Sequence, residues 1–215
     1  MHFAFLTEDS SGMRLLELLL PRLIGGFGEP HTSDLHAYKG IGRIPPGLSP
    51  RSDPSKRILL DQLPRLLRGY AKTPGFDKVI VVLDTDRRDC SELLAELKQV
   101  AVACNAEHLA LFRLAIEETE AWYLGDREAL LLAYPTAKKS ILDRDVQDAV
   151  CDTWERLADV VHAGGLQAIQ KAGWPIVGQV KHEWASKIGP LMDPERNRSP
   201  SFGKLRDGLR RLVEY

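Results

Sequence analysis

The sequence predicts an α/β fold, in which a mostly parallel β-sheet is flanked by helices and followed by a helical C-terminal extension. The strongest observation is Val79–Leu83 (VIVVL), a run typical of a central strand that is covered on both faces. Short apolar runs also alternate with helical apolar spacing up to Asp126, which indicates an open parallel sheet. Only helical patterns follow Asp126. We therefore expect an α/β domain over residues 1–126 and a helical extension over residues 127–215 that packs on it.

The elements before the central strand follow from apolar runs and capping residues. His2–Thr7 is a short apolar run that predicts the first strand, and the Ser-Ser-Gly segment after it caps a helix over 13–23. Residues 33–38 alternate weakly and predict a second strand. Residues 39–57 form a loop with five Lys or Arg, four Pro, three Gly and one Asp, and loops of this length are usually functional or disordered. Helical apolar spacing follows over 58–70.

Beyond the central strand the same alternation continues once more. We expect helices over 90–104 and 116–124, with a strand over 108–114 between them. The extension then carries only helical patterns, and its three tryptophans supply apolar anchors. Its predicted helices span residues 127–133, 146–162, 166–172, 180–188 and 202–214.

Composition and charge exclude several classes of protein. The chain has 215 residues, 44% of them hydrophobic and 27% charged, which excludes a disordered, collagen-like or coiled-coil chain. No apolar run approaches the roughly 18 residues that a membrane span needs, and the N-terminus turns acidic at once, unlike a signal peptide. Cys90, Cys104 and Cys151 show no CxxC spacing, so we expect a reducing cytoplasm and no structural zinc site. The net charge of −1 excludes a polycationic coat protein and little else, because residues 165–215 carry nine basic and five acidic groups.

Acidic residues follow the predicted strands, at the edge where an open parallel sheet forms its active site. Glu8 and Asp9 follow the first strand, and Asp84 and Asp86 follow the central one. The i, i+2 spacing points Asp84 and Asp86 the same way if the chain stays extended. Asp9 alone is better explained as a residue at a helix N-terminus than as a ligand, because the helix dipole favours acidic residues there.

A third acidic group, Glu117, Glu118 and Glu120, follows the fourth predicted strand. Glu117 is also explained as a residue that interacts with a helix dipole. If the three strand ends converge, their carboxylates repel one another and require a cation or raised pKa values. Mg²⁺ and Mn²⁺ suit such oxygen-only sites, which support in-line phosphoryl transfer.

The order of Glu8 after the first strand and Asp84-Thr85-Asp86 after a later one resembles the Toprim domain of topoisomerases, primases and overcoming-lysogenization-defect-type nucleases. The chain also resembles an uncharacterised, Toprim-like bacterial family of about this length. The resemblance implies Mg²⁺ or Mn²⁺ held by Glu8, Asp84 and Asp86, with Glu118 and Glu120 matching that family's acidic pair. Asp9 stands where Toprim domains usually have Gly. The segments that carry the resemblance are Phe5–Gly12, Val82–Cys90, Ile116–Asp126 and Ser199–Leu205.

Basic residues near these segments have two interpretations each. Lys181 either supplies a cation or a base beside the metal, as a catalytic residue, or lies on a solvated helix face. Arg87 and Arg88 either meet phosphate oxygens or pair with the neighbouring carboxylates. Arg43 lies in the basic loop, which together with the basic C-terminal part is expected to contact a nucleic-acid backbone.

We therefore expect a metal-dependent nuclease that hydrolyses phosphodiesters of nucleic acid in the cytoplasm. The resemblance adds a separate ATPase subunit as a partner and a role in defence against phage or plasmids. Two alternatives stay open, a non-catalytic Toprim-like binding component and a metal-dependent phosphohydrolase of small molecules. A homo-oligomer also stays open, and no membrane partner is expected.

Overall fold

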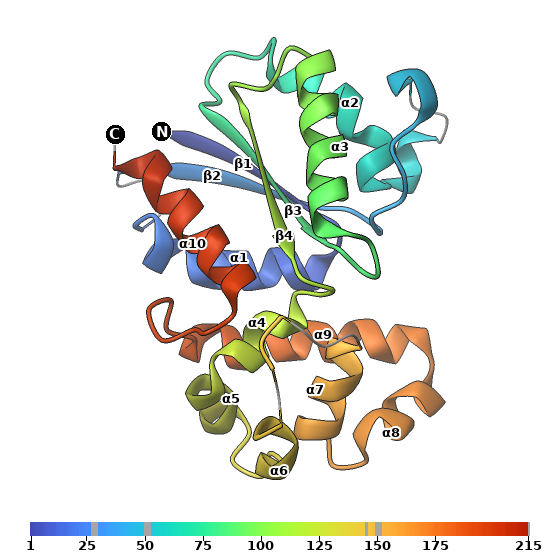
Figure 1. Cartoon of the computed structure of the whole chain (residues 1–215), viewed down its shortest axis with the longest axis vertical. Coiled ribbons are helices and arrows are strands. Elements are labelled where there is room, and N and C mark those ends of the chain that lie inside the picture. Colours follow the sequence, from blue (N-terminus) through green and yellow to red (C-terminus); the bar gives the residue numbers. More distant parts are fainter. Residues whose placement is uncertain (27–29, 50–52, 145, 149–151, 215) are drawn as a thin grey trace.

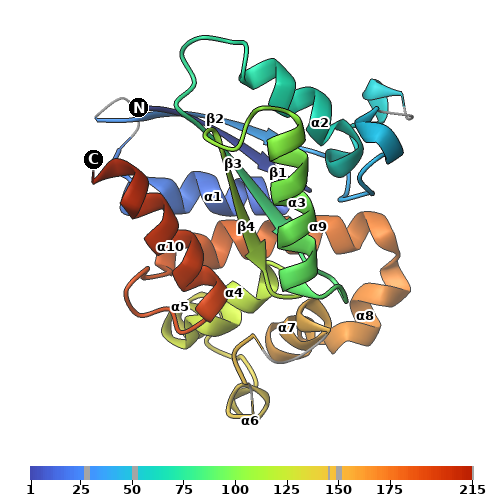
Figure 2. The same ribbon diagram turned by 45° about the horizontal axis from the view of Figure 1, so that its top comes forward.

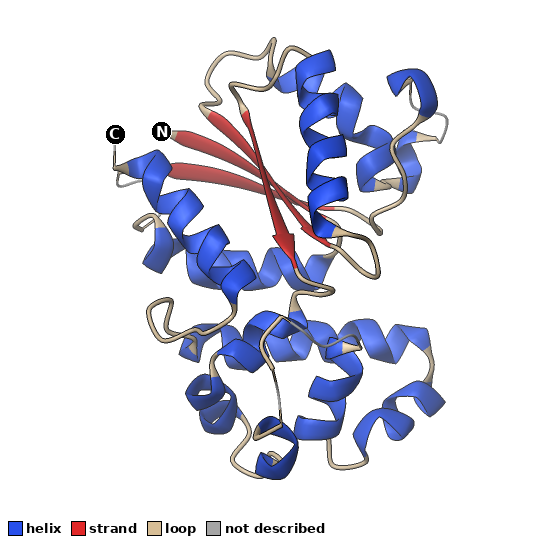
Figure 3. Ribbon diagram, viewed as in Figure 1, coloured by secondary structure: helices blue, strands red, loops and turns tan. Residues whose placement is uncertain are grey.

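A parallel sheet of four strands lies at the centre of the part of the chain that is described, in the order β2-β1-β3-β4. The computed structural model describes residues 1–26, 30–49, 53–144, 146–148 and 152–214. The VIVVL run lies in an inner strand that pairs with a neighbour on each side, so the α/β prediction is confirmed (Figure 3). The strands are β1 (His2–Thr7), β2 (Thr32–Ala37), β3 (Lys78–Asp84) and β4 (Ala110–Ala115).

The sheet separates two hydrophobic cores. The covering helices are α1 (Ser10–Leu23), α2 (Leu59–Tyr70), α3 (Cys90–Ala103), α9 (Trp174–Ile188) and α10 (Pro200–Val213). Successive side chains of a strand point to opposite faces, so Phe3 and Phe5 of β1 lie in one core while Ala4 and Leu6 lie in the other. The first core includes α1, α9 and α10, and the second includes α2 and α3 (Figure 2).

The remaining helices gather at the end of the molecule toward which β4 runs (Figure 1). They are α4 (Glu120–Gly125), α5 (Arg127–Ala133), α6 (Lys139–Leu142), α7 (Thr153–Val161) and α8 (Gly165–Ala172). Three short 3-10 helices lie elsewhere in the described chain: η1 (Pro46–Leu48) and η2 (Pro54–Lys56) in the basic loop, and η3 (Gly189–Leu191) after α9. Trp184 and Phe202 of the extension share one core with Leu15 and Trp122, and the rings of Trp122 and Phe202 lie 5.7 Å apart. The extension therefore has a hydrophobic core in common with the sheet. Among the described residues, no helix has both the length and the apolar character that crossing a membrane requires.

Several predicted helix boundaries are wrong. The helix predicted from residue 116 begins at Glu120, because a turn with a left-handed residue at Glu117 precedes it. The helix predicted over 146–162 begins at Thr153, and the helix predicted from residue 180 begins at Trp174, where Pro175 in its first turn favours a helix start. The short helix α6 is not predicted at all. Cys151 and residues 50–52 of the basic loop lie outside the described residues.

Gly125, the last residue of α4, gives a test of how tightly the extension packs. A Cβ atom there would lie 2.3 Å from Asn197 Oδ1 and 2.9 Å from the backbone nitrogen of Ser199. Overpacking of this kind costs about 1–3 kcal/mol, so we expect Gly125→Ala to lower the free energy of unfolding by that amount in urea denaturation. Gly178→Ala is the control, because a Cβ on this exposed residue of α9 meets nothing within 4 Å. The control should raise stability by about 0.5–1 kcal/mol, and equal effects of the two variants would contradict the prediction.

Candidate active site

Glu8 and Asp84 meet at the carboxyl ends of adjacent strands. Thr7, the last residue of β1, pairs with Val82 of β3, so the residues that follow lie side by side. The backbone N–H of Asp84 donates to Glu8 Oε2 at 3.3 Å. Parallel pairing of two strands therefore brings together the first and second predicted acidic groups.

Thr119 orients the Asp84 carboxylate from the turn before α4. Its hydroxyl donates to Asp84 Oδ1 at 2.7 Å. A small cavity of about 10 Å³ lies between Glu8, Asp84, Thr119 and their neighbours, which is room for a single water molecule. Sequence reasoning missed Thr119, although a hydroxyl residue inside the Glu-rich segment was the available signal.

The surroundings of the two strand-end carboxyl groups disfavour their ionised forms in the absence of a cation. Burial, followed by repulsion from Asp9 and Asp86, raises the pKa of Glu8 to about 8. Burial, followed by repulsion from Glu8 and Glu120, raises the pKa of Asp84 well above its usual range. A bound cation would relieve both effects, because it favours the ionised form of each carboxylate.

Lys181 of α9 lies on the other side of this cluster. Its Nζ is 3.0 Å from Glu118 Oε1 and 3.5 Å from Glu120 Oε2, and it lies 5.6 Å from the centre of the Trp154 ring. Burial opposes the charged lysine, but Glu120, Glu118 and Asp84 outweigh burial and raise the pKa of Lys181. Burial raises the pKa of Glu120 to about 7, although Lys181 works against this shift. Lys181 is therefore a half-buried, charged residue of the cluster and does not lie on a solvated helix face.

Glu117 and Glu118 hold the start of α7 against the sheet. The Glu117 carboxylate accepts the backbone N–H groups of Asp152 and Thr153, the latter at 2.7 Å. Glu118 Oε2 accepts the backbone N–H of Trp154 at 3.1 Å and the Thr153 hydroxyl at 3.3 Å. Because its other oxygen accepts from Lys181, both oxygens of Glu118 already have partners. Glu117 and Glu118 are thus engaged within the protein, and a cation at this edge would bind the other carboxylates, above all the adjoining Glu8 and Asp84.

Asp86 does not point the same way as Asp84. It adopts a left-handed backbone with φ of 48°, so the chain is not extended after Asp84. Its backbone N–H donates to the Glu117 carbonyl at 2.9 Å, and its side chain is exposed while Asp84 is buried. Asp86 still acts on the pKa of Glu8, so it lies at the outer margin of the cluster.

The basic loop passes directly beside this margin. The backbone N–H of Gly40 donates to the carbonyl of Glu8 at 2.8 Å. Arg43 of the loop, together with Asp86 and Arg88, lines a hollow of about 530 Å³. Arg87 instead reaches Asp152 at 3.5 Å, in an ion pair whose two side chains are largely exposed.

The carboxylates fit an open magnesium site better than a closed one. Across residues 1–26, 30–49, 53–144, 146–148 and 152–214, no three His, Cys, Asp or Glu side chains form a group that could hold a metal ion. Mg²⁺, however, usually binds through one or two carboxylates and completes its shell with water and substrate phosphate. Glu8 and Asp84 meet that requirement.

The Toprim resemblance and the metal dependence stay predictions. Comparisons of the chain with family models, with curated proteins and with solved structures found no match.

Proposed function

We propose that this protein is a Mg²⁺- or Mn²⁺-dependent nuclease that hydrolyses phosphodiester bonds of nucleic acid. The observation that supports this most is the pair of adjoining strand-end carboxylates, Glu8 and Asp84, whose pKa values are raised by burial and by repulsion from neighbouring carboxylates. Strongly shifted carboxylates at the carboxyl edge of a parallel sheet favour a functional site over a structural one.

Glu8 and Asp84 would hold the metal, with exposed Asp86 as an additional carboxylate at the margin. The donors are all oxygen atoms, which suits Mg²⁺ and Mn²⁺. When bound, the metal would supply charge stabilisation for the attacking and leaving oxygens of an in-line displacement. Thr119 would keep one oxygen of Asp84 in a fixed orientation through its 2.7 Å hydrogen bond.

Lys181 would contribute as a fixed cation. Because its raised pKa keeps the ammonium group charged at neutral pH, it is unsuited to act as a base. Its contacts with Glu118 and Glu120 hold the ammonium group where it also acts on Asp84. A charge held in place in this way stabilises negative charge on a phosphoryl group without reorganisation.

Arg43 and Arg88 would contact the phosphate backbone of the substrate. The two arginines line one hollow beside Asp86, and no ion pair of either is found in the described part of the chain. Phosphate contacts of this kind give affinity that does not depend on sequence and that falls as salt rises. The resemblance adds two further proposals, a separate ATPase subunit and a cytoplasmic role in defence against phage or plasmids.

A plasmid-nicking assay with Mn²⁺ tests the proposed function. We expect wild-type protein to nick plasmid DNA and Asp84→Asn to do so at least about 100-fold more slowly, because the variant loses a negative metal ligand. Glu107→Gln is the control, because Glu107 is exposed and precedes β4 at the opposite edge of the sheet. Equal cleavage by wild type and Asp84→Asn would contradict the proposed site, and no cleavage by either would contradict a nuclease that acts alone. Turnover of a generic phosphomonoester with no nicking would favour a small-molecule phosphohydrolase.

One observation favours the non-catalytic alternative. Lys181 already neutralises Glu118 and Glu120, so part of the acidic cluster is balanced without any metal. In that case millimolar Mg²⁺ would leave the melting temperature unchanged, since a ligand raises stability only when it binds the native state. The same melting experiment on Asp84→Asn separates binding at this site from binding elsewhere.

A further inference from the structure

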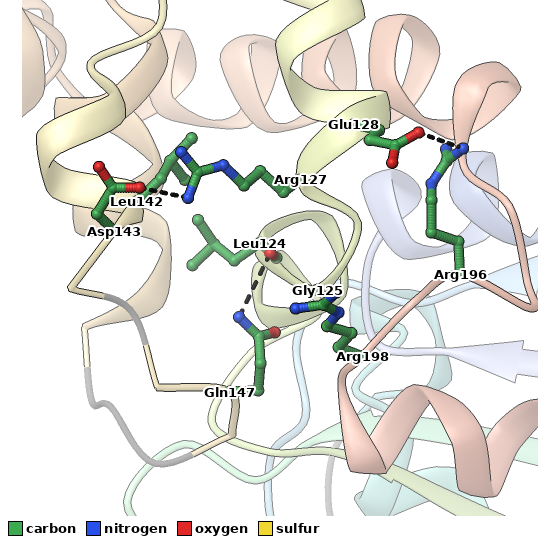
Figure 4. Close-up of a pocket in the computed structure, with 9 residues that line it drawn as sticks. All are labelled: Leu124, Gly125, Arg127, Glu128, Leu142, Asp143, Gln147, Arg196 and Arg198. Atoms are coloured by element: carbon green, nitrogen blue, oxygen red, sulfur yellow. Dashed lines mark hydrogen bonds and ion pairs between the residues drawn. The ribbon is translucent and has the colours of Figure 1, made fainter.

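Another cavity lies in the helical extension, at the end of α4 opposite to the acidic cluster. Its volume is about 370 Å³. Three arginines line it, Arg127 from the start of α5 and Arg196 and Arg198 from the segment before α10, and we call it the arginine cavity (Figure 4). Glu120, at the first residue of α4, is about 7–8 Å along the helix axis from Gly125, which lines the cavity. The cavity is thus separate from the site formed by Glu8 and Asp84.

Hydrogen bonds to backbone carbonyl groups of α4 hold one wall of the arginine cavity in place. The backbone N–H of Arg198 donates to the Gly125 carbonyl at 2.9 Å, and the Asn197 side chain donates to the Trp122 carbonyl at 2.8 Å. Leu124 and Leu142 are buried and give the cavity an apolar surface. The cavity therefore presents apolar and cationic groups on a wall that hydrogen bonds fix to α4.

The three arginines differ in how fully they are paired. Arg196 is held at 2.8 Å by Asp126, whose side chain is fully buried, and it also contacts Glu128 at 3.0 Å. Arg127 pairs with Asp143 at 2.5 Å, but both side chains are about half exposed. An exposed ion pair of this kind contributes little, so Arg127 can exchange its partner at small cost.

Arg198 has no side-chain partner among the residues that the structure describes. Figure 4 shows its guanidinium group extending toward Gly125 and the middle of the cavity. Arg196 and Arg127 have carboxylate partners in Asp126, Glu128 and Asp143, so Arg198 is the lining arginine whose charge no side-chain contact of the described residues neutralises. A free guanidinium group in a partly apolar cavity favours an anion with an organic part.

We propose that the arginine cavity binds a small organic phosphate. Arg198 would receive the phosphate group as a bidentate donor, and Arg127 would join it after release from Asp143. The organic part would lie against Leu124 and Leu142. A volume of about 370 Å³ is near the lower end for small-molecule sites, so the ligand is no larger than about a mononucleotide. This inference does not depend on the proposed nuclease function.

Calorimetric titration with adenosine 5′-monophosphate in the presence of EDTA tests the proposal. EDTA removes divalent metal, so the Glu8–Asp84 site cannot hold the phosphate through a cation. We expect wild type to bind the nucleotide, and Arg198→Gln to bind it at least about 10-fold more weakly, because a charge-assisted hydrogen bond is lost. Arg198 is exposed and its backbone contact is retained, so the variant should keep the melting temperature of wild type.

Two controls locate the binding. Lys98→Gln removes an exposed lysine of α3, and Arg211→Gln removes an exposed arginine near the end of α10. Both should bind the nucleotide as wild type does. Unchanged binding in Arg198→Gln would overturn the proposal, as would no binding by wild type. Inorganic phosphate should bind more weakly than the nucleotide, and equal affinity would overturn the assigned role of the two leucines.

Discussion

Lys181→Met is expected to lower the free energy of unfolding by about 3–5 kcal/mol at about pH 8, because it leaves two carboxylates in the protein interior without their cation. The side chain of Glu120 is only 3% exposed and that of Glu118 is 17% exposed. Methionine keeps the length of the lysine stem but cannot neutralise either group. Urea denaturation of wild type and variant measures the difference.

The size of this loss should depend on pH. Burial already raises the pKa of Glu120 to about 7. At about pH 4.5 Glu120 is therefore protonated, so part of the charge that Lys181 neutralises is removed and the loss should shrink. Lys187→Met is a matched control on the same helix, because Lys187 pairs with Glu183 at 2.5 Å with both side chains half exposed. Its loss should stay within about 1 kcal/mol. An effect of Lys181→Met as small as that of the control would contradict the assignment of Lys181 to the buried cluster.

The central parts of the fold could be predicted from local sequence, because burial on both faces leaves a continuous apolar run. Val79–Leu83 is the clearest case, and its position between two strands agrees with that pattern. Helix boundaries could not be predicted equally well. Glu117 lies in a segment whose residue types favour a helix, but its carboxylate accepts the backbone N–H of Thr153, which is 36 residues away in sequence. Long-range hydrogen bonds of this kind leave no local pattern.

The same distinction explains which parts of the candidate site could be predicted. Glu8 and Asp84 are strand-end residues, so a parallel sheet brings them together whatever the rest of the chain does. The position of Asp86 depends on one left-handed residue, which the DxD spacing does not reveal. Lys181 is 61 residues from Glu120 in sequence, and only the packing of α9 on α1 brings it to the cluster.

The metal-free protein is expected to lose stability as pH rises from about 4.5 through about 8, and Glu8→Gln is expected to remove the share of that loss that Glu8 contributes. The pKa of Glu8 is raised from its ordinary value of 4.5 to about 8, so the folded protein holds a proton that the unfolded chain releases. A group with a raised pKa contributes its full stability below the unfolded pKa and loses it as pH passes the folded pKa. One pKa unit corresponds to about 1.4 kcal/mol, so the free energy of unfolding lost through Glu8 is at most about 4–5 kcal/mol. Because Glu8 is only half-buried, solvent screening makes the actual loss smaller.

Urea denaturation in EDTA across this pH range measures the effect, with Glu107→Gln as the control on the opposite edge of the sheet. Glu8→Gln should be more stable than wild type at about pH 9 and close to it at about pH 4.5, because glutamine keeps the acceptor for the Asp84 N–H but carries no charge. Parallel pH profiles for wild type and Glu8→Gln would contradict the prediction. Mg²⁺ should restore stability to wild type at high pH and have little effect on the variant, because a cation acts on the same charge that the substitution removes. Ionised Glu8 would then favour metal binding but lower the stability of the metal-free protein. Such an opposition is expected where a binding site keeps a carboxylate ionised in the protein interior.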